Sequence, residues 1–152
     1  MTSAPIRAVI VTEKISYIRE MIEALRNLPL SSHDDFSSDA RNAAAAESYL
    51  RRALEALFDL GRHILAKGFA AAPTEYKEIA AILTQKSILS KDHGQILREM
   101  AGYRNRMVHF YNEIGEEELY HICRDELTDI EDISRALTTW LRDHPRKIDA
   151  AL

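Results

Sequence analysis

Apolar residues recur every three or four positions from residue 39 to 67, and no other feature constrains the fold as strongly. The central row of this pattern and the row that widens it are Leu50, Leu54, Leu57, Gly61 and Ile64, with Ala46, Tyr49, Ala53, Ala56 and Leu60. Positions spaced in this way share one face of an α-helix, whereas a strand would alternate with a period of two. The pattern therefore predicts one long helix, whose broad apolar face has to be covered by other helices.

Similar spacing predicts four further helices. They cover Val11 to Leu25, Glu75 to Gln85, the stretch from Ser90 to Val108, and Glu116 to Pro145. The polar run SSHDDFSSD, which follows Pro29, is predicted to be a break between two of them. No segment alternates as a strand would. The predicted fold class is therefore all-α, an antiparallel helical bundle of four long helices plus one short helix.

The chain length of 152 residues predicts a single domain, with its helical core at about residues 8–145. A net charge of −4 argues against a protein that coats nucleic acid with its whole surface, but it allows one local basic site. The only cysteine, Cys123, lies on an apolar stripe and is predicted to pack in the core. Because no intrachain disulfide is possible and no apolar stretch reaches about 18 residues, we expect a cytoplasmic chain that does not bind membranes.

Polar side chains crowd into the segment RNRMVHFYNE, where the apolar helical pattern should continue. Within eight positions it holds Arg104, Asn105, Arg106, His109 and Tyr111. Five residues of an α-helix turn through about 500°, so Arg104 and His109 would lie about 140° apart on an ideal helix. A compact site therefore requires the helix end to bend, or a second copy of the chain to face it across a two-fold axis.

The residue types in this segment suit chemistry on a phosphate. Histidine, with an ordinary pKa of about 6.5, exchanges protons near neutral pH, and arginine binds phosphate oxygens through two parallel N–H bonds. Together they fit cleavage of an RNA phosphodiester without a metal, in which one group deprotonates the 2′-OH and a cation stabilises the charge on the phosphate. The alternative interpretation is a helix-end cap with a patch of surface ion pairs.

The arrangement Arg-x4-His-x-Tyr, formed by Arg104, His109 and Tyr111, resembles the signature of the HEPN superfamily and in particular of the HepT-like toxin family. Three flanking segments are similar as well: ESYLRRALEALFDLGRHILAKG, EYKEIAAILTQKSILSKDHGQILREMAGYRNRMVHFYNEI and LYHICRDELTDIEDI. The resemblance covers about residues 8–145. Arg-x4-His alone is a weak signal, and Asn105, Tyr111 and the flanking helices make it more specific.

This resemblance implies an all-helical homodimer that acts as a metal-independent endoribonuclease toxin, with the motif lining a cleft between the two copies. Arg104 and His109 would be its catalytic residues, the first binding the phosphate and the second acting as acid and base, while Asn105 orients the substrate or His109. Arg106 does not fit the motif spacing and is predicted to help position the RNA backbone or to form an ion pair. The resemblance also implies a nucleotidyltransferase antitoxin, MNT, which attaches AMP to Tyr111 and so blocks the cleft.

Other patterns give little reason to expect a different site. Glu118-x-x-His121 has a spacing that di-iron bundles use, but no second pair completes it, so a solvated first turn is the better interpretation. Asp59 and His63 lie four apart, beside Arg62, and are predicted to form a structural hydrogen bond, with a minor role in lining the cleft. The chain has no Gly-rich phosphate loop and no zinc spacing, so we expect no cofactor and no metal. The rival function is a non-catalytic HEPN-type module that dimerises and binds a nucleotidyltransferase or a nucleotide.

Overall fold

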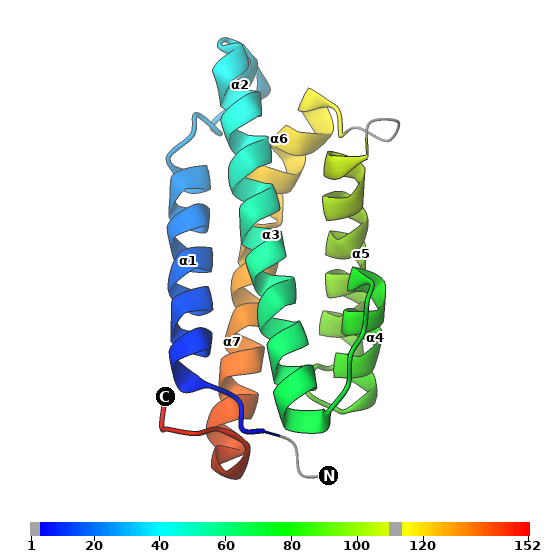
Figure 1. The fold of residues 1–152 in the computed structure, drawn as a ribbon. Coiled ribbons are helices and arrows are strands. Elements are labelled where there is room, and N and C mark those ends of the chain that lie inside the picture. Colours follow the sequence, from blue (N-terminus) through cyan, green and yellow to red (C-terminus); the bar gives the residue numbers. More distant parts are fainter. Residues whose placement is uncertain (1–3, 110–113) are drawn as a thin grey trace.

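The computed structural model describes residues 4–109 and 114–152, and the regular elements within these residues are helices (Figure 1). They are α1 (Ala8–Arg26), α2 (His33–Ser37), α3 (Ala40–Phe69), α4 (Tyr76–Gln85), α5 (Lys91–Val108), α6 (Glu116–Asp125), α7 (Leu127–Asp143) and the short 3-10 helix η1 (Pro145–Lys147). One isolated backbone bridge joins Ile6 to Ile148. For the described residues, the all-α prediction is therefore confirmed. None of the helices described there is long and apolar enough to cross a bilayer.

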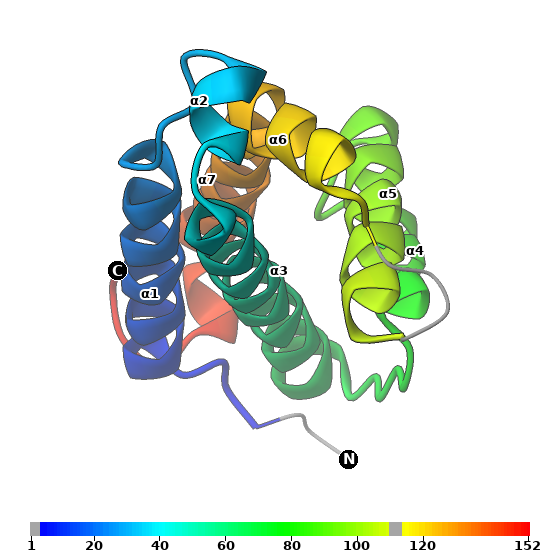
Figure 2. The ribbon, with the colours of Figure 1, turned by 90° about the horizontal axis from the view of Figure 1, so that it is seen from above.

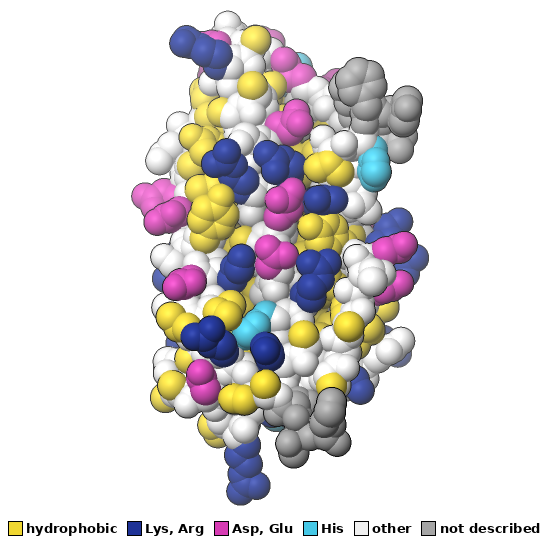
Figure 3. All heavy atoms as spheres, in the orientation of Figure 1, with side chains coloured by type: hydrophobic (Ala, Val, Ile, Leu, Met, Phe, Trp, Pro, Cys, Tyr) yellow, Lys and Arg dark blue, Asp and Glu magenta, His cyan; other side chains and the backbone are white. Residues whose placement is uncertain are grey.

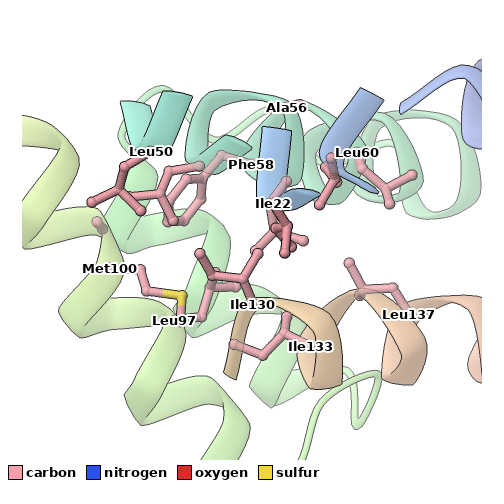
Figure 4. Close-up of a cluster of buried hydrophobic side chains, with 14 of the residues drawn as sticks. Ile22, Leu50, Ala56, Phe58, Leu60, Leu97, Met100, Ile130, Ile133 and Leu137 are labelled. Atoms are coloured by element: carbon pink, nitrogen blue, oxygen red, sulfur yellow. The ribbon is translucent and has the colours of Figure 1, made fainter. Parts of the chain in front are cut away.

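Helix α3 is the spine of the bundle, and its 30 residues extend over about 45 Å. It lies between α1 on one side and α4 with α5 on the other, while α6 runs across one end (Figure 2). The predicted apolar face is buried, because the side chains of Leu50, Leu54 and Ile64 are all 0% exposed. Figure 4 shows side chains of α3, such as Leu50 and Leu60, in one core with side chains of α1, α5 and α7.

The predicted helix from Glu116 to Pro145 is in fact two helices, α6 and α7, which meet at Glu126. The backbone there has φ −115° and ψ 2°, and the Glu126 carboxylate accepts a hydrogen bond of 3.1 Å from the Tyr103 hydroxyl. This change of direction lets α6 close one end of the bundle, where Tyr120 is buried and donates to the Leu30 carbonyl. The spacing of apolar residues does not reveal the break, because it keeps the helical interval across Glu126.

The polar run that was predicted to separate two helices contains the short helix α2. Ser32 caps this helix by accepting a hydrogen bond from the Asp35 N–H, and Phe36 anchors it in the core with 0% exposure. One buried residue among polar neighbours produces no periodic pattern, so sequence spacing could not indicate this helix. The described residues thus form four α-helices of at least 17 residues and three shorter α-helices, where the sequence predicted only one short helix.

Cys123 packs in the core, as predicted, with 1% of its surface exposed. Burial raises the pKa of its thiol to about 12. The thiolate is therefore scarce at neutral pH, and the folded chain should react slowly with thiol reagents.

Two glycines of α5 offer a matched test of how closely α4 and α5 pack. A Cβ on Gly94 would lie 2.0 Å from the Thr84 Oγ1, whereas a Cβ on Gly102 would meet no neighbouring atom within 4 Å. We expect Gly94→Ala to lower the free energy of unfolding by about 1–3 kcal/mol through overpacking. Gly102→Ala should raise it by up to about 1 kcal/mol, because alanine favours helix more than glycine does. Urea unfolding of both variants measures the two effects, and equal values would contradict the close approach at Gly94.

His63 of α3 holds the N-terminal segment in place. Its Nε2 accepts a hydrogen bond of 3.0 Å from the backbone N–H of Arg7. His63 therefore bonds to Arg7, and not to Asp59 as predicted. Asp59 instead forms ion pairs with Lys14 and Arg62, each at 3.5 Å, because both cations lie beside its carboxylate.

The bond from Arg7 makes the stability of the chain depend on the protonation of His63. Desolvation, together with the charges of Lys67 and Arg7, lowers the pKa of His63 below its ordinary value of 6.5. The unfolded chain then binds this proton more readily than the folded chain, so the free energy of unfolding should fall as pH drops below about 6.5. We expect His63→Gln, whose amide oxygen can accept the same bond, to lack this part of the pH dependence. Thermal unfolding at about pH 7.5 and about pH 5.5 checks it, and an equal loss in both proteins would contradict it.

Candidate active site

A surface cavity of about 490 Å³ lies where the C-terminal end of α5 faces α3 and the start of α4. It is lined by Arg62, Thr74, Glu75, Tyr76, Lys77, Arg104, Asn105 and His109. Three residues predicted for the site, Arg104, Asn105 and His109, thus share one cavity. Arg106 does not line it, and Tyr111 lies outside the described residues.

The end of α5 brings Arg104 and His109 to the same cavity. The helix stops at Val108, and His109 adopts an extended backbone with φ −96° and ψ 115°. Its N–H still donates to the Asn105 carbonyl at 3.0 Å, so the last backbone bond of the helix is made by His109. On an ideal helix the two side chains would diverge, and the departure from helical geometry at His109 accompanies their lining of one cavity.

The Arg104 guanidinium is held from several sides. Its central carbon lies 4.5 Å from the centroid of the Tyr76 ring, and its Nε lies 3.4 Å from the Glu55 carboxylate. A third contact, 3.5 Å long, joins its Nη1 to the side-chain oxygen of Asn105. The Nε has no hydrogen bond of good geometry within the described chain. Arg104 is therefore positioned by its neighbours while part of its donor capacity is unused.

Three residues of this arrangement were not found from the sequence: Glu55, Arg62 and Tyr76. Tyr76 stacks on the buried Phe58 with ring centroids 4.7 Å apart, and the Arg62 guanidinium carbon lies 5.6 Å from the Tyr76 centroid. One available signal for Glu55 and Arg62 was the polar row that they form with Asp59 on α3, beside its apolar face. Its intervals of four and three place it on one face of the helix.

Basic side chains outnumber acidic ones among the described residues that line the cavity. Arg62, Lys77 and Arg104 line it, with Glu75 as the single carboxylate among its described lining residues and His109 beside them. On the face drawn in Figure 3, Lys and Arg side chains gather along the middle, interleaved with Asp and Glu. The cavity therefore attracts anions, although the chain as a whole has a net charge of −4.

Arg106 is committed to an ion pair outside the cavity. Its two terminal nitrogens donate to both oxygens of Glu118 at 2.7 Å, and this pair raises the pKa of Arg106 and lowers that of Glu118. The pair also uses the carboxylate of the Glu118-x-x-His121 spacing. In residues 4–109 and 114–152, no three His, Cys, Asp or Glu side chains are grouped so that they could hold a metal ion.

A comparison that covers most of the chain decides to which family it belongs. A family model described as ribonuclease HepT-like matches residues 14–137. The chain belongs to the HepT-like family. The match confirms the resemblance that was drawn from Arg104, His109 and Tyr111, and the matched residues include every side chain that lines the cavity.

Two curated relatives of this HepT-like chain are nucleases by name. The mRNA nuclease HepT of Shewanella oneidensis is 25% identical over 122 residues, which are 80% of this chain and 91% of that protein. The tRNA nuclease HepT of Aphanizomenon flos-aquae is 25% identical over 115 residues, which are 76% of this chain and 78% of that protein.

Solved structures share the fold of this HepT-like chain. One is a tri-AMPylated HEPN toxin of Shewanella oneidensis in complex with an MNT antitoxin, with a TM-score of 0.78 and 23% identity over 86% of this chain and 97% of that one. Another is the cytosolic protein YutE of Bacillus subtilis, with a TM-score of 0.72 and 18% identity over 88% of this chain and 90% of that one. At such identities the likeness shows a common fold.

Proposed function

We propose that this chain is the ribonuclease toxin of a toxin–antitoxin pair and cleaves RNA in the cavity at the end of α5. The observation that carries the proposal is that Arg104 and His109 line one cation-rich cavity. Membership of the ribonuclease HepT-like family and the nuclease names of both curated relatives support it. A guanidinium and an imidazole in one anion-attracting cavity suit phosphodiester cleavage.

The proposed reaction is an internal transesterification. His109 takes the proton of the ribose 2′-OH, the 2′-oxygen forms a bond to phosphorus, and the bond from phosphorus to the 5′-oxygen breaks. Arg104 stabilises the negative charge that builds on the phosphate oxygens, and Asn105 orients the substrate or His109. The leaving 5′-oxygen receives a proton, so the products are a 2′,3′-cyclic phosphate and a 5′-hydroxyl. This route uses no metal ion and no cofactor.

A homodimer completes the proposed site. If two copies face each other at the end of α5, two Arg104 and two His109 side chains line one cleft. One histidine can then take the 2′ proton while the other gives a proton to the leaving oxygen, which a single imidazole would have to do in turn. Arg106, although paired with Glu118, would contribute positive charge at the edge of such a cleft and help position the RNA backbone.

The chemistry of the cleaved ends tests this function. Purified protein is incubated with a mixed RNA pool in the presence of EDTA, and the new 3′ ends are examined by mass spectrometry. We expect 2′,3′-cyclic phosphates and 5′-hydroxyls. Intact RNA, or ends that carry a 5′-phosphate, would be incompatible with the proposed route.

Control by an antitoxin is the second part of the proposal. We infer that an MNT-type nucleotidyltransferase attaches AMP to Tyr111, since a HEPN toxin of the same fold has been solved in a tri-AMPylated state with its MNT antitoxin. Each AMP adds bulk and a phosphate charge two residues from His109. The modified side chain would pair with Arg104, fill the cavity and repel RNA.

Modification of Tyr111 should be visible in the intact mass of the chain. After co-expression with the nucleotidyltransferase encoded beside it, we expect the mass to increase in whole AMP steps and RNA cleavage to disappear. Tyr111→Phe should show neither change while it still cleaves RNA. Mass steps that persist in Tyr111→Phe would place the modification on another residue.

A further inference from the structure

The cavity holds a second guanidinium, that of Arg62, for which the proposed reaction at Arg104 has no role. We propose that Arg62 binds the phosphate next to the one being cleaved, and that the Tyr76 ring positions Arg62 and Arg104 for two successive phosphates of a single RNA strand. This inference rests on the proposed function. It adds a substrate-binding subsite formed by α3 and α4, which lie far from the motif in the sequence.

The Tyr76 ring is the common support of the two cations. The guanidinium carbons of Arg104 and Arg62 lie 4.5 and 5.6 Å from its centroid, so they are at most about 10 Å apart, a span within reach of successive phosphates in a cationic groove. Phe58 stacks on the ring with an interplanar angle of 24°, and we infer that Arg104 covers the opposite face, where the stacked Phe58 ring leaves room for it. With both faces covered, Tyr76 is not free to stack on a base, and its contribution is to hold the two guanidiniums.

The carboxylates near these cations hold them loosely. Glu55 lies 3.4 Å from Arg104 and 3.3 Å from Arg51, and Asp59 lies 3.5 Å from both Arg62 and Lys14. Each carboxylate is thus shared by two cations at distances longer than the 2.7–2.9 Å of a strong charged hydrogen bond.

A pair outside the cavity shows the contrast. Arg106 and Glu118 form two bonds of 2.7 Å, which leave little for another ligand. Four cations on or beside α3 share the carboxylates of Glu55 and Asp59; they are Lys14, Arg51, Arg62 and Arg104. The group therefore keeps a net positive charge and has N–H donors left for phosphate.

The salt dependence of RNA binding tests this subsite without relying on cleavage. All variants carry His109→Ala, so that the RNA stays intact, and a fluorescent single-stranded ribo-oligonucleotide is titrated by anisotropy at several salt concentrations. The plot of log K against log salt has a negative slope, and losing one phosphate contact to a single strand makes this slope shallower by about 0.7. We expect this decrease, with weaker binding, for Arg62→Ala.

The matched control is Arg135→Ala on α7. Arg135 pairs with Asp132 three residues before it, just as Arg62 pairs with Asp59, but it does not line the cavity. The slope of this variant should stay unchanged. Equal slopes for Arg62→Ala and Arg135→Ala, or a parent that binds no RNA, would overturn the subsite.

Tyr76 is tested by a conservative and a disruptive variant. Tyr76→Phe keeps the ring and should keep the slope, whereas Tyr76→Ala should reduce the magnitude of the slope at least as much as Arg62→Ala does, because the ring positions both guanidiniums. An equal loss in both Tyr76 variants would assign the effect to the hydroxyl and contradict a supporting ring. If binding follows these expectations but the chain with His109 does not cut RNA, Arg62 is still a phosphate-binding residue for single-stranded RNA, and the ribonuclease proposal falls.

Discussion

Arg104→Ala should lower kcat for RNA cleavage by about 100- to 1,000-fold, the effect of removing one group that stabilises charge in a transition state. Arg104→Lys should restore little of it. An ammonium cannot form two parallel bonds to a phosphate, nor does it offer a planar group to the Tyr76 ring, whose centroid lies 4.5 Å from the guanidinium carbon. Single-turnover cleavage of a labelled RNA measures both variants and separates the chemical step from product release.

His109→Ala should cost about 100- to 10,000-fold, which is the usual contribution of a general acid or base. Arg124→Ala is the control for both substitutions. Arg124 lies over the Tyr120 ring at 5.3 Å and pairs with Asp125, yet it does not line the cavity, so its loss should leave kcat close to the wild-type value. In cells, growth arrest on expression should be relieved by both site substitutions and not by Arg124→Ala.

These variants also discriminate between the enzyme and the rival function. A non-catalytic HEPN-type module would dimerise and hold a nucleotidyltransferase or a nucleotide in the same cavity, without cutting RNA. In that case, RNA would remain intact with the wild-type chain and with both variants, and expression would be equally harmless for all three. Cleavage that persists in Arg104→Ala and His109→Ala would instead point to another site in the chain.

The sequence predicted the main helices because burial dictates their pattern. Every third or fourth residue of α3 faces the core, and the side chains at these positions are apolar wherever the helix is covered. The pattern missed two features, a change in chain direction and a helix that has only one buried residue. Glu126 redirects the chain between α6 and α7 while the apolar interval continues, and α2 is anchored by the single residue Phe36.

Separation along the sequence explains which site residues were predicted. Arg104, Asn105 and His109 are close in sequence, so their motif could be recognised before the fold was known. Arg62 and Tyr76 reach the cavity from other helices, and which exposed residue of α3 faces α5 is set by how the helices pack against each other. A single sequence contains no local signal for that packing, although the polar row on α3 marked the residues that it could involve.

Phe58→Ala should lower the free energy of unfolding by about 3–5 kcal/mol, because the substitution empties a fully buried position. Phe36→Ala should cost a similar amount, since Phe36 is also 0% exposed. Its ring centroid lies 5.6 Å from that of Tyr120, a residue that does not line the cavity. Urea unfolding followed by circular dichroism measures both. The two variants therefore form a pair that is matched in residue type and in burial.

Their effect on cleavage should differ, because of the two only Phe58 stacks on a residue that lines the proposed active site. Its ring stacks on Tyr76, whose own ring lies 4.5 Å from the Arg104 guanidinium carbon, so a void at Phe58 should let the Arg104 guanidinium shift. A displacement of about 1 Å can cost about 100-fold in rate, and we expect a loss approaching this size for Phe58→Ala at a temperature where both variants are folded. Phe36→Ala should keep its kcat there. If both variants lose activity in proportion to stability, the Phe58–Tyr76 stack contributes to folding and has no separate part in placing Arg104.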